Sequence, residues 1–211
     1  MKYTLIWELL QLVDKFERQQ PDAGKQTLSE FIAWLLRQGN PVAETPGSQW
    51  QEPASTGISR LLFFGQRYAL VYMRQVLEGT PLTTIDDFTY LITLLYRPGL
   101  TKIQLIEDHI HGKTTGMEII RRLLSAGFIR QQDSEVDKRS RLLFITAAGE
   151  GLVKQLVGKL VQVGEVVVGD LNEQEQAYLL YMLTRLHQYH NPIYRGGPAE
   201  VERVLKEKGV L

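Results

Sequence analysis

The chain has 211 residues, 44% of them hydrophobic and 23% charged, and its 24 lysines and arginines balance 24 aspartates and glutamates. These proportions are typical of a soluble globular protein of one or two domains. Because no apolar run approaches the length of a membrane span, we expect a cytoplasmic protein. Cysteine is absent, which excludes disulfides and thiol-based oxidant sensing.

Residues 1–39 predict an N-terminal helical extension. Apolar residues recur at helical spacing from Met1 to Phe16, and Glu8 and Asp14 lie among them, so this start is an amphipathic helix and no signal peptide. A second short helix follows and closes at Gly39. We expect both helices to pack on the helices that form a dimer.

Residues 40–57 are rich in proline and glycine and predict a linker or surface loop. Residues 58–80 follow as a dimerisation or core helix that is apolar around much of its girth. Such a helix is buried on several sides, one against its own domain and another, most simply, against a second subunit. The next helix, Asp86 to Tyr96, is stopped by a Pro-Gly pair.

Residues 100–146 begin with two short helices joined by a turn. Thr101 and Gln104 fit a capping box at the start of the first helix. The turn is His111-Gly112. The second helix carries an apolar stripe at helical spacing and ends at Gly127.

A two-stranded ribbon follows these helices. Residues 128–132 and 142–145 predict the strands, and the charged stretch 133–140 predicts a solvated loop between them. Two helices followed by such a ribbon make a winged helix-turn-helix. The predicted fold class is therefore mostly α with a small β-wing, in which a winged helix-turn-helix domain over residues 81–148 is flanked by dimerisation helices.

Residues 149–211 predict C-terminal dimerisation helices. Thr146 is placed to cap the first of them. Asn172 and Glu175 form a capping box that opens the last long helix. We expect Asn191-Pro192 to stop that helix, because proline cannot donate a backbone hydrogen bond.

The winged segment resembles the MarR family of multiple-antibiotic-resistance regulators. The similarity runs without gaps from Leu100 through Gly127 into the wing. There Asp137-Lys138-Arg139 precedes an apolar-x-apolar-Thr close at residues 143–146, and Gly149 also matches. The close match covers about 50 residues, and the flanking helices agree in order and length.

The resemblance implies a MarR-like DNA-binding transcriptional regulator that binds palindromic operator DNA as a homodimer and is released by a small-molecule effector. The effector pocket would lie between the DNA-binding lobe and the dimerisation helices, near Tyr68, Tyr72, Phe88 and Tyr90. Core packing is the favoured alternative for these aromatic residues. The chain shows neither a nucleophile-base-orienter set nor a phosphate-cradling glycine motif, so we expect no enzyme and no cofactor.

The recognition helix and the wing supply the candidate DNA contacts. N-terminal residues of such a helix reach base edges in the major groove; here these are Lys113, Thr114, Thr115, Met117 and Glu118. Further along, Arg121 or Arg122 suits a phosphate. In the wing, the resemblance implies that Arg139 enters the minor groove and that Asp137 holds the loop, and Lys138 and Arg141 add positive charge. The alternatives are a solvated helix face and a weak surface ion pair.

The chain departs from the family at two positions of the recognition helix, where relatives often have Val and Arg. Gly116 costs about 1 kcal/mol relative to alanine inside a helix. That cost shrinks if the helix begins at Thr115, because residues 115–118 themselves fit a capping box. Glu118 would then be a structural cap, which we favour, and otherwise a base reader.

Two further readings compete with these predictions. His109 with His111, and His187 with His190, suggest metal ligands, but helix-end or turn roles are favoured for both pairs. The neutral net charge and Glu118 favour a rival function, a winged-helix protein-interaction module without DNA binding.

Overall fold

The chain forms two units, Met1–Pro53 and Ala54–Leu211. The computed structural model describes residues 4–20, 22, 26–39, 53–133 and 140–211. Within these ranges, every helix is too short or too polar to cross a lipid bilayer.

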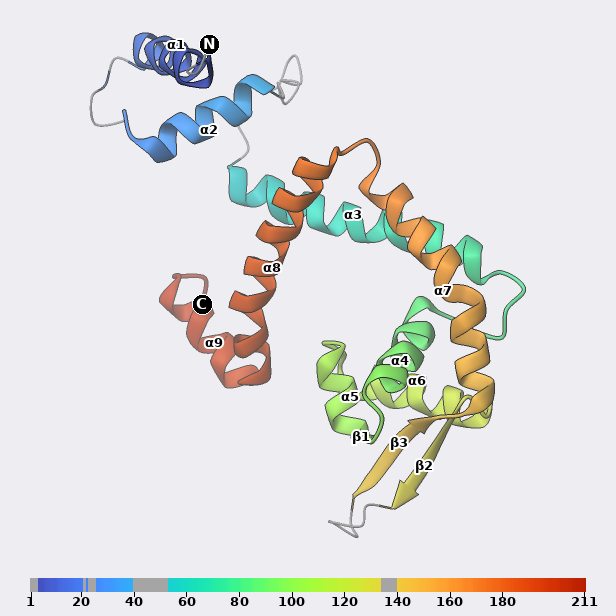
Figure 1. The fold of residues 1–211 in the computed structure, drawn as a ribbon. Helices are drawn as coiled ribbons and strands as arrows, with labels where there is room; N and C mark the ends of the chain where they lie inside the picture. The colour runs from blue at the N-terminus through green and yellow to red at the C-terminus, as the bar shows by residue number, and fades with distance from the viewer. Residues whose placement is uncertain (1–3, 21, 23–25, 40–52, 134–139) are drawn as a thin grey trace. The chain divides into compact units, whose positions relative to one another are not determined.

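The described residues of the first unit form helices α1 (Thr4–Gln19) and α2 (Leu28–Gly39) (Figure 1). They meet through an aromatic cluster in which the Phe16 ring lies 5.4 Å from Phe31 and 5.7 Å from Trp34. The two predicted helices are present, and their role as an extension that packs on dimerisation helices stays a prediction.

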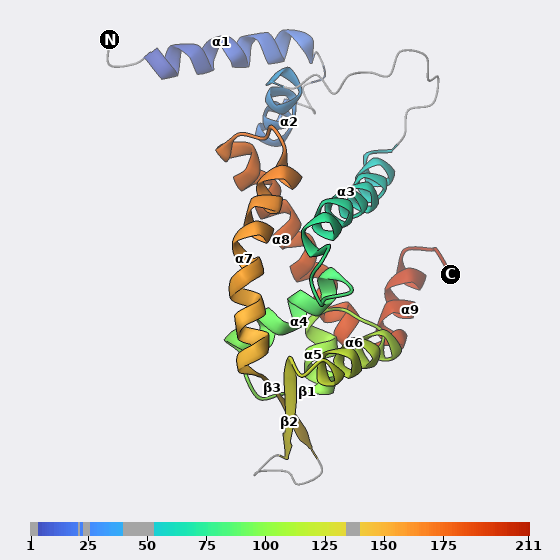
Figure 2. The same ribbon diagram turned by 90° about the vertical axis from the view of Figure 1, so that its right-hand side faces the viewer.

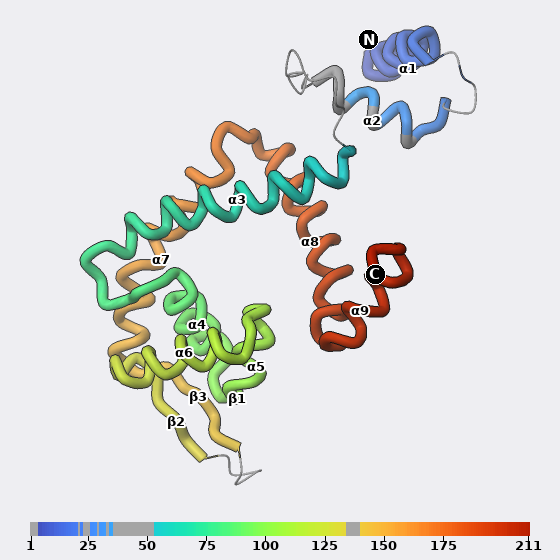
Figure 3. The backbone as a smooth tube through the Cα atoms, turned by 180° about the vertical axis from the view of Figure 1, so that it is seen from behind, coloured from blue at the N-terminus to red at the C-terminus, as the bar shows by residue number. Residues whose placement is uncertain are grey.

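The second unit has the predicted fold class. Its elements in chain order are α3 (Ala54–Leu77), α4 (Ile85–Tyr96), β1 (Leu100–Thr101), α5 (Lys102–Asp108), α6 (Lys113–Ser125), β2 (Ile129–Asp133), β3 (Arg141–Ile145), α7 (Ala147–Val168), α8 (Glu173–Arg195) and α9 (Pro198–Glu207). Helix α3 packs along α7, and α4 packs on α7, α6 and β3 (Figures 1 and 3). Helix α3 begins at Ala54, before the expected start at residue 58.

One apolar core joins α4, α6, α7 and the wing. Its fully buried side chains include Tyr90 and Leu94 of α4, Leu123 of α6, Leu143 of β3 and Leu156 of α7. Burying an aliphatic or aromatic side chain of this size contributes roughly 1.5–3 kcal/mol. This core therefore fixes the recognition helix, α6, against the rest of the unit.

The wing is a three-stranded antiparallel sheet in the order β1-β3-β2. The two predicted strands are confirmed, and they pair with Ile129 opposite Ile145. Figure 2 shows this ribbon projecting from the base of α7. Strand β1 was not predicted, because two residues are too short to show an alternating pattern.

Gly149 lets α7 approach the wing. A Cβ at this position would collide with the backbone carbonyl of Phe128 and would lie 2.8 Å from Ile145 Cγ1. Thr146, the residue that caps α7, also donates its hydroxyl to the Phe128 and Gly127 carbonyls. The sequence similarity at Gly149 thus marks a position where only glycine fits.

The predicted helix starts are confirmed. Thr101 and Gln104 form the capping box of α5, and the Thr146 hydroxyl accepts from the backbone N–H of Gly149. The capping box of Asn172 and Glu175 opens α8. These starts depend on residues within one turn of each other, which a sequence shows directly.

The expected stop of α8 at Asn191-Pro192 is wrong, because the helix continues to Arg195 with Pro192 inside it. Proline removes one backbone donor, but its carbonyl still accepts from Gly196 N at 2.9 Å. The last turn is also held from outside, since Tyr194 and Arg195 bond to the winged domain. Tertiary contacts therefore outweigh the local proline signal.

Candidate nucleic-acid interface

The recognition helix α6 presents a polar face. Its N-cap is Gly112, and its opposite face is buried in the core through Ile119, Ile120 and Leu123. Six of the predicted contact residues are exposed on the outer face: Lys113, Thr114, Thr115, Met117, Glu118 and Arg121. The helical period thus places six of the seven predicted residues of this helix on one solvent-facing side.

The preferred reading of Thr115 and Glu118 as a capping box is wrong. The helix begins at Lys113, so Thr115 is already inside it. Gly116 has another role: it is buried, and a Cβ there would lie 2.9 Å from Ile106 Cδ1 and still nearer to Cγ1 of the same side chain. The glycine therefore allows α5 and α6 to approach closely, and Glu118 lies exposed on the outer face.

Arg122 points inward, toward α4. Its Nη2 lies 2.6 Å and its Nε 3.0 Å from Asp87 Oδ1, and the Asp87 side chain is 1% exposed. Asp87 also accepts from the backbone N–H groups of Thr83 and Thr84, at the start of α4. The guanidinium of Arg122 is thus engaged inside the protein, and Arg121 is the exposed one of the two arginines.

The described part of the wing carries two arginines. Arg130 lies over the Phe144 ring at 4.8 Å, and its Nη1 donates to Gln132 at 2.9 Å. Arg141 is exposed, with its Nε 3.5 Å from Asp133 across the ribbon. The predicted wing residues Asp137, Lys138 and Arg139 lie outside the described residues.

Lys102 belongs to the same surface but was not predicted. It is the first residue of α5 and lines a groove of about 460 Å³ with residues of α6: Thr114, Met117, Glu118, Ile120, Arg121 and Leu124. Only the folded helix pair brings Lys102 beside α6. The one sequence signal for Lys102 is its position directly after the Thr101 cap, which makes it the first residue of α5.

The turn between α5 and α6 is held by aromatic and hydroxyl groups of α4. Tyr90 Oη lies 3.0 Å from His111 Nδ1, and Thr93 Oγ1 lies 3.0 Å from His109 Nε2. Burial is the main cause that raises the pKa of Tyr90 to about 12. Burial, and then the neighbouring His111, lower the pKa of the His109 imidazole. The two hydrogen bonds therefore hold the turn against α4, and the lowered pKa favours the neutral form of the His109 imidazole.

The second histidine pair lies near the end of α8. His187 Nε2 is 3.3 Å from Asn191 Nδ2, and the His190 ring packs edge-on against Tyr189. Among the described residues, histidine, aspartate and glutamate form no group of three or more that could hold a metal ion.

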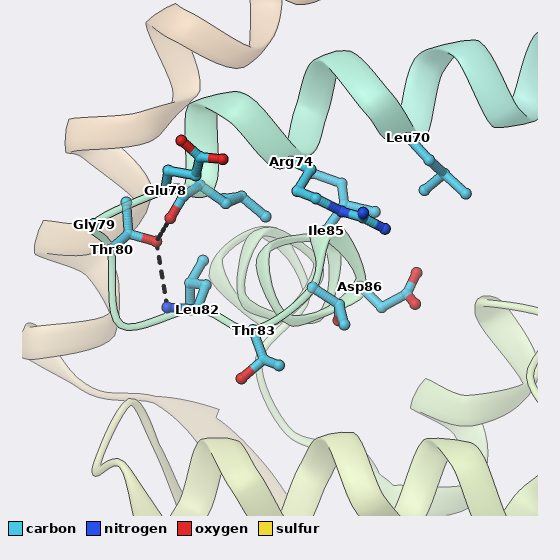
Figure 4. Close-up of a pocket in the computed structure, with 11 residues that line it drawn as sticks. Leu70, Arg74, Glu78, Gly79, Thr80, Leu82, Thr83, Ile85 and Asp86 are labelled. Atoms are coloured by element: carbon cyan, nitrogen blue, oxygen red, sulfur yellow. Dashed lines mark hydrogen bonds between the residues drawn. The ribbon is translucent and has the colours of Figure 1, made fainter.

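A cavity of about 510 Å³ lies between the end of α3 and the start of α4. Leu70 and Arg74 reach into it from α3, and Ile85 and Asp86 face it from α4 (Figure 4). The aromatic residues predicted for an effector pocket do not line this cavity: Tyr68 and Tyr72 are exposed on α3, whereas Phe88 and Tyr90 belong to the core.

Two bacterial regulators are similar to the chain in sequence, although no protein-family model matches it. The chain is 26% identical over 106 residues to the transcriptional regulator HosA of Escherichia coli, which covers 50% of this chain and 78% of HosA. It is 23% identical over 121 residues to the HTH-type transcriptional repressor NicR of Pseudomonas putida, a match that covers 57% of this chain and 75% of NicR.

Solved structures of MarR-type regulators share the fold. BpsR of Bordetella bronchiseptica, whose DNA binding is regulated by 6-hydroxynicotinic acid, superposes with a TM-score of 0.60 at 20% identity, covering 65% of this chain and 97% of BpsR. A MarR regulator from Methanosarcina mazei superposes with a TM-score of 0.58 at 20% identity, and the match covers 64% of this chain and 97% of that regulator. An Escherichia coli MarR mutant bound to operator DNA superposes with a TM-score of 0.56 at 21% identity, and the match covers 62% of this chain and 93% of the mutant. The chain thus has the winged-helix fold of MarR-type regulators.

Proposed function

We propose that this chain is a MarR-like transcriptional regulator that binds palindromic operator DNA as a homodimer. The observation that carries the proposal is the outer face of α6, where Lys113, Thr114 and Arg121 are exposed while the opposite face is locked in the core. An α-helix held in this way fits the major groove of B-DNA.

Each part of the surface has a role in this proposal. Lys113, Thr114, Thr115 and Met117 contact bases or phosphates near the start of α6, while Arg121 and Lys102 contact phosphates. Arg141 adds charge on the wing. Asp137, Lys138 and Arg139 enter the proposal on the sequence resemblance alone, with Arg139 in the minor groove.

The zero net charge does not oppose this function, because what matters is the charge at the contact surface. Arg122 does not contribute to that charge, since Asp87 neutralises it inside the protein. Glu118 is the one acid among the six exposed contact residues predicted on α6, and its negative charge would repel a DNA phosphate at that position. We therefore assign it to the choice of operator sequence.

The homodimer is supported by apolar side chains that the single chain leaves exposed. Large exposed apolar surfaces mark interaction sites in soluble proteins. On α3 these side chains include Leu61, Phe63, Tyr68 and Val71, and on α8 they include Tyr178, Leu180, Tyr181 and Met182. A two-fold dimer would place two recognition helices on the two halves of a palindrome.

An effector site completes the proposal. The cavity between α3 and α4 offers the cation of Arg74 and the carboxylates of Glu78 and Asp86 beside apolar side chains such as Leu70 and Ile85, which suits a small organic molecule with polar groups. We take 6-hydroxynicotinic acid as the probe because it acts on BpsR. It should raise the melting temperature of the wild type and not that of Arg74→Gln. An equal shift in both proteins would remove this cavity from the proposal.

The deciding experiment is selection of bound duplexes from a random DNA library. A regulator should enrich a palindrome, and Lys113→Ala and Arg121→Ala should weaken binding to it. Lys206→Ala on α9 is the matched control, because it removes an exposed cation that pairs with Glu202 of the same helix. Enrichment of no sequence would favour the rival, a winged-helix module that binds protein.

A further inference from the structure

The end of α8 touches the turn that precedes the recognition helix. The Tyr194 hydroxyl donates to the backbone carbonyl of His111 at 2.9 Å. The next residue, Arg195, places Nη2 2.8 Å from Asp108 Oδ1. The two bonds link residues more than eighty positions apart in the chain, and we call this pair of contacts the α8 clasp.

The bonds of the clasp reach the turn on both sides of its most strained residue. Asp108 is the last residue of α5, and His111 directly precedes Gly112, the N-cap of α6. Between them Ile110 has a φ of 57°, in the left-handed region that β-branched residues avoid. A turn of this kind persists only where its surroundings hold it.

Asp108 also joins the clasp to α4. Its second oxygen, Oδ2, accepts a hydrogen bond at 2.8 Å from Nη1 of Arg97, the C-cap residue of α4. Asn191 orients the other arginine, since its Oδ1 accepts from Arg195 Nε at 2.9 Å. One carboxylate therefore connects the ends of α4, α5 and α8.

Helix α8 otherwise has little hold on the winged domain. None of its residues is buried. Among the residues that the structure describes, Tyr194 and Arg195 are the ones through which α8 makes hydrogen bonds to the winged domain. Its apolar surface is exposed along the rest of its length, where the proposed dimer would cover it.

We propose that Tyr194 and Arg195 are positioning residues for DNA binding, which hold the start of α6 in place and couple it to the position of α8. The inference rests on the proposed function, because it concerns the same recognition helix. Neither side chain needs to touch DNA: they act through the turn. A displacement of α8 would break the clasp, release the turn and weaken DNA binding.

The test uses Tyr194→Phe and Arg195→Gln in the full chain. Tyr96→Phe on α4, at a residue 76% exposed, and Arg203→Gln on α9, whose ion pair with Glu200 is exposed, are matched controls that make the same chemical changes outside the clasp and outside the proposed dimer surface of α8. Three quantities are measured for each protein: DNA affinity against salt, the melting temperature, and hydrogen exchange of the backbone amides from residues 112 to 115.

Tyr194→Phe should weaken DNA binding about five- to tenfold, the effect of losing one half-buried hydrogen bond. Arg195→Gln should weaken it about two- to fivefold, because its ion pair is half exposed. Both should speed exchange of the turn amides. Tyr194→Phe should leave the salt slope unchanged, since no phosphate contact is lost, whereas a lysine that touches phosphate lowers that slope by about one ion.

The outcomes separate the two claims. If the wild type binds DNA and both variants keep its affinity and its rate of amide exchange, the proposed role of the clasp is overturned. Tighter binding by the variants would also overturn it, because the contact would then be inhibitory. If the wild type bound no DNA, the proposed function would fail, and unchanged exchange of the turn amides would still refute the clasp on its own.

Discussion

Arg122 of α6 forms an ion pair at 2.6 Å with the buried carboxylate of Asp87 of α4, which fixes the recognition helix to the helix beneath it. The Asp87 carboxylate also accepts hydrogen bonds from the backbone N–H groups of Thr83 and Thr84, at the start of α4. The same carboxylate thus caps one helix and anchors another. The recognition helix is thereby oriented by charge as well as by its apolar face.

Asp87→Ala should destabilise the fold by about 3 kcal/mol, because it leaves the Arg122 charge partly buried without its partner. The melting temperature and a denaturant titration would measure this loss. Asp133→Ala is the control: that ion pair is exposed, and its removal should cost less than about 0.5 kcal/mol. Equal effects of the two substitutions would contradict the anchoring role of Asp87.

Gly116→Ala should destabilise the protein by about 1–3 kcal/mol, because the added methyl group collides with the buried, β-branched Ile106. Inside an open helix the same change stabilises by roughly 1 kcal/mol. Gly151→Ala in α7, where nothing lies within 4 Å of the new Cβ, should show that gain. Truncation of Ile106 to alanine removes the three atoms nearest to the new Cβ and should lower the cost of Gly116→Ala, and an equal cost in both backgrounds would place the strain elsewhere.

These relationships show what the sequence can and cannot predict. The caps at Thr101 and Thr146 and the strands of the wing could be predicted, because each depends on residues close together in the chain. The inward direction of Arg122 could not, since its partner lies on another helix. Nor could the passage of α8 beyond Pro192, which depends on contacts with a distant turn.

The pKa of His109 predicts an acid-sensitive fold. Burial lowers this pKa in the folded state, so the unfolded chain binds a proton more readily. The free energy of unfolding should therefore fall as the pH drops below about 6.5 and on through the lowered pKa. His109→Gln should reduce this fall, measured as melting temperature against pH. An identical pH dependence in both proteins would show that other groups control it.

Mild peroxide should not release DNA through thiol chemistry, because the chain contains no cysteine. Met117 is 38% exposed on the outer face of α6, and its oxidation would place a polar sulfoxide there. Any loss of affinity should therefore persist in thiol reductant, and Met117→Leu should remove the share that comes from the sulfoxide on α6. Reversal of the loss by thiol reductant alone would be inconsistent with this chemistry.

The homodimer predicts a mass near twice that of the 24.1 kDa chain in sedimentation equilibrium at micromolar concentration. The physical reason is the exposed apolar surface of α3 and α8, which a second subunit would cover. Tyr181→Glu and Met182→Glu on α8 should favour the monomer, whereas Lys206→Glu on α9 should not. A monomeric wild type would remove both the dimer and the palindromic operator.

The central claim, that α6 binds DNA, is tested most directly by the salt dependence of affinity for the selected duplex. Anisotropy titrations of the wild type and Lys113→Ala at several salt concentrations give the slope. We predict a log-linear fall in affinity, from release of about 0.9 counterion per phosphate contact, and a slope smaller by about one ion in Lys113→Ala. An affinity independent of salt, or equal slopes in the two proteins, would contradict a DNA contact at the start of α6.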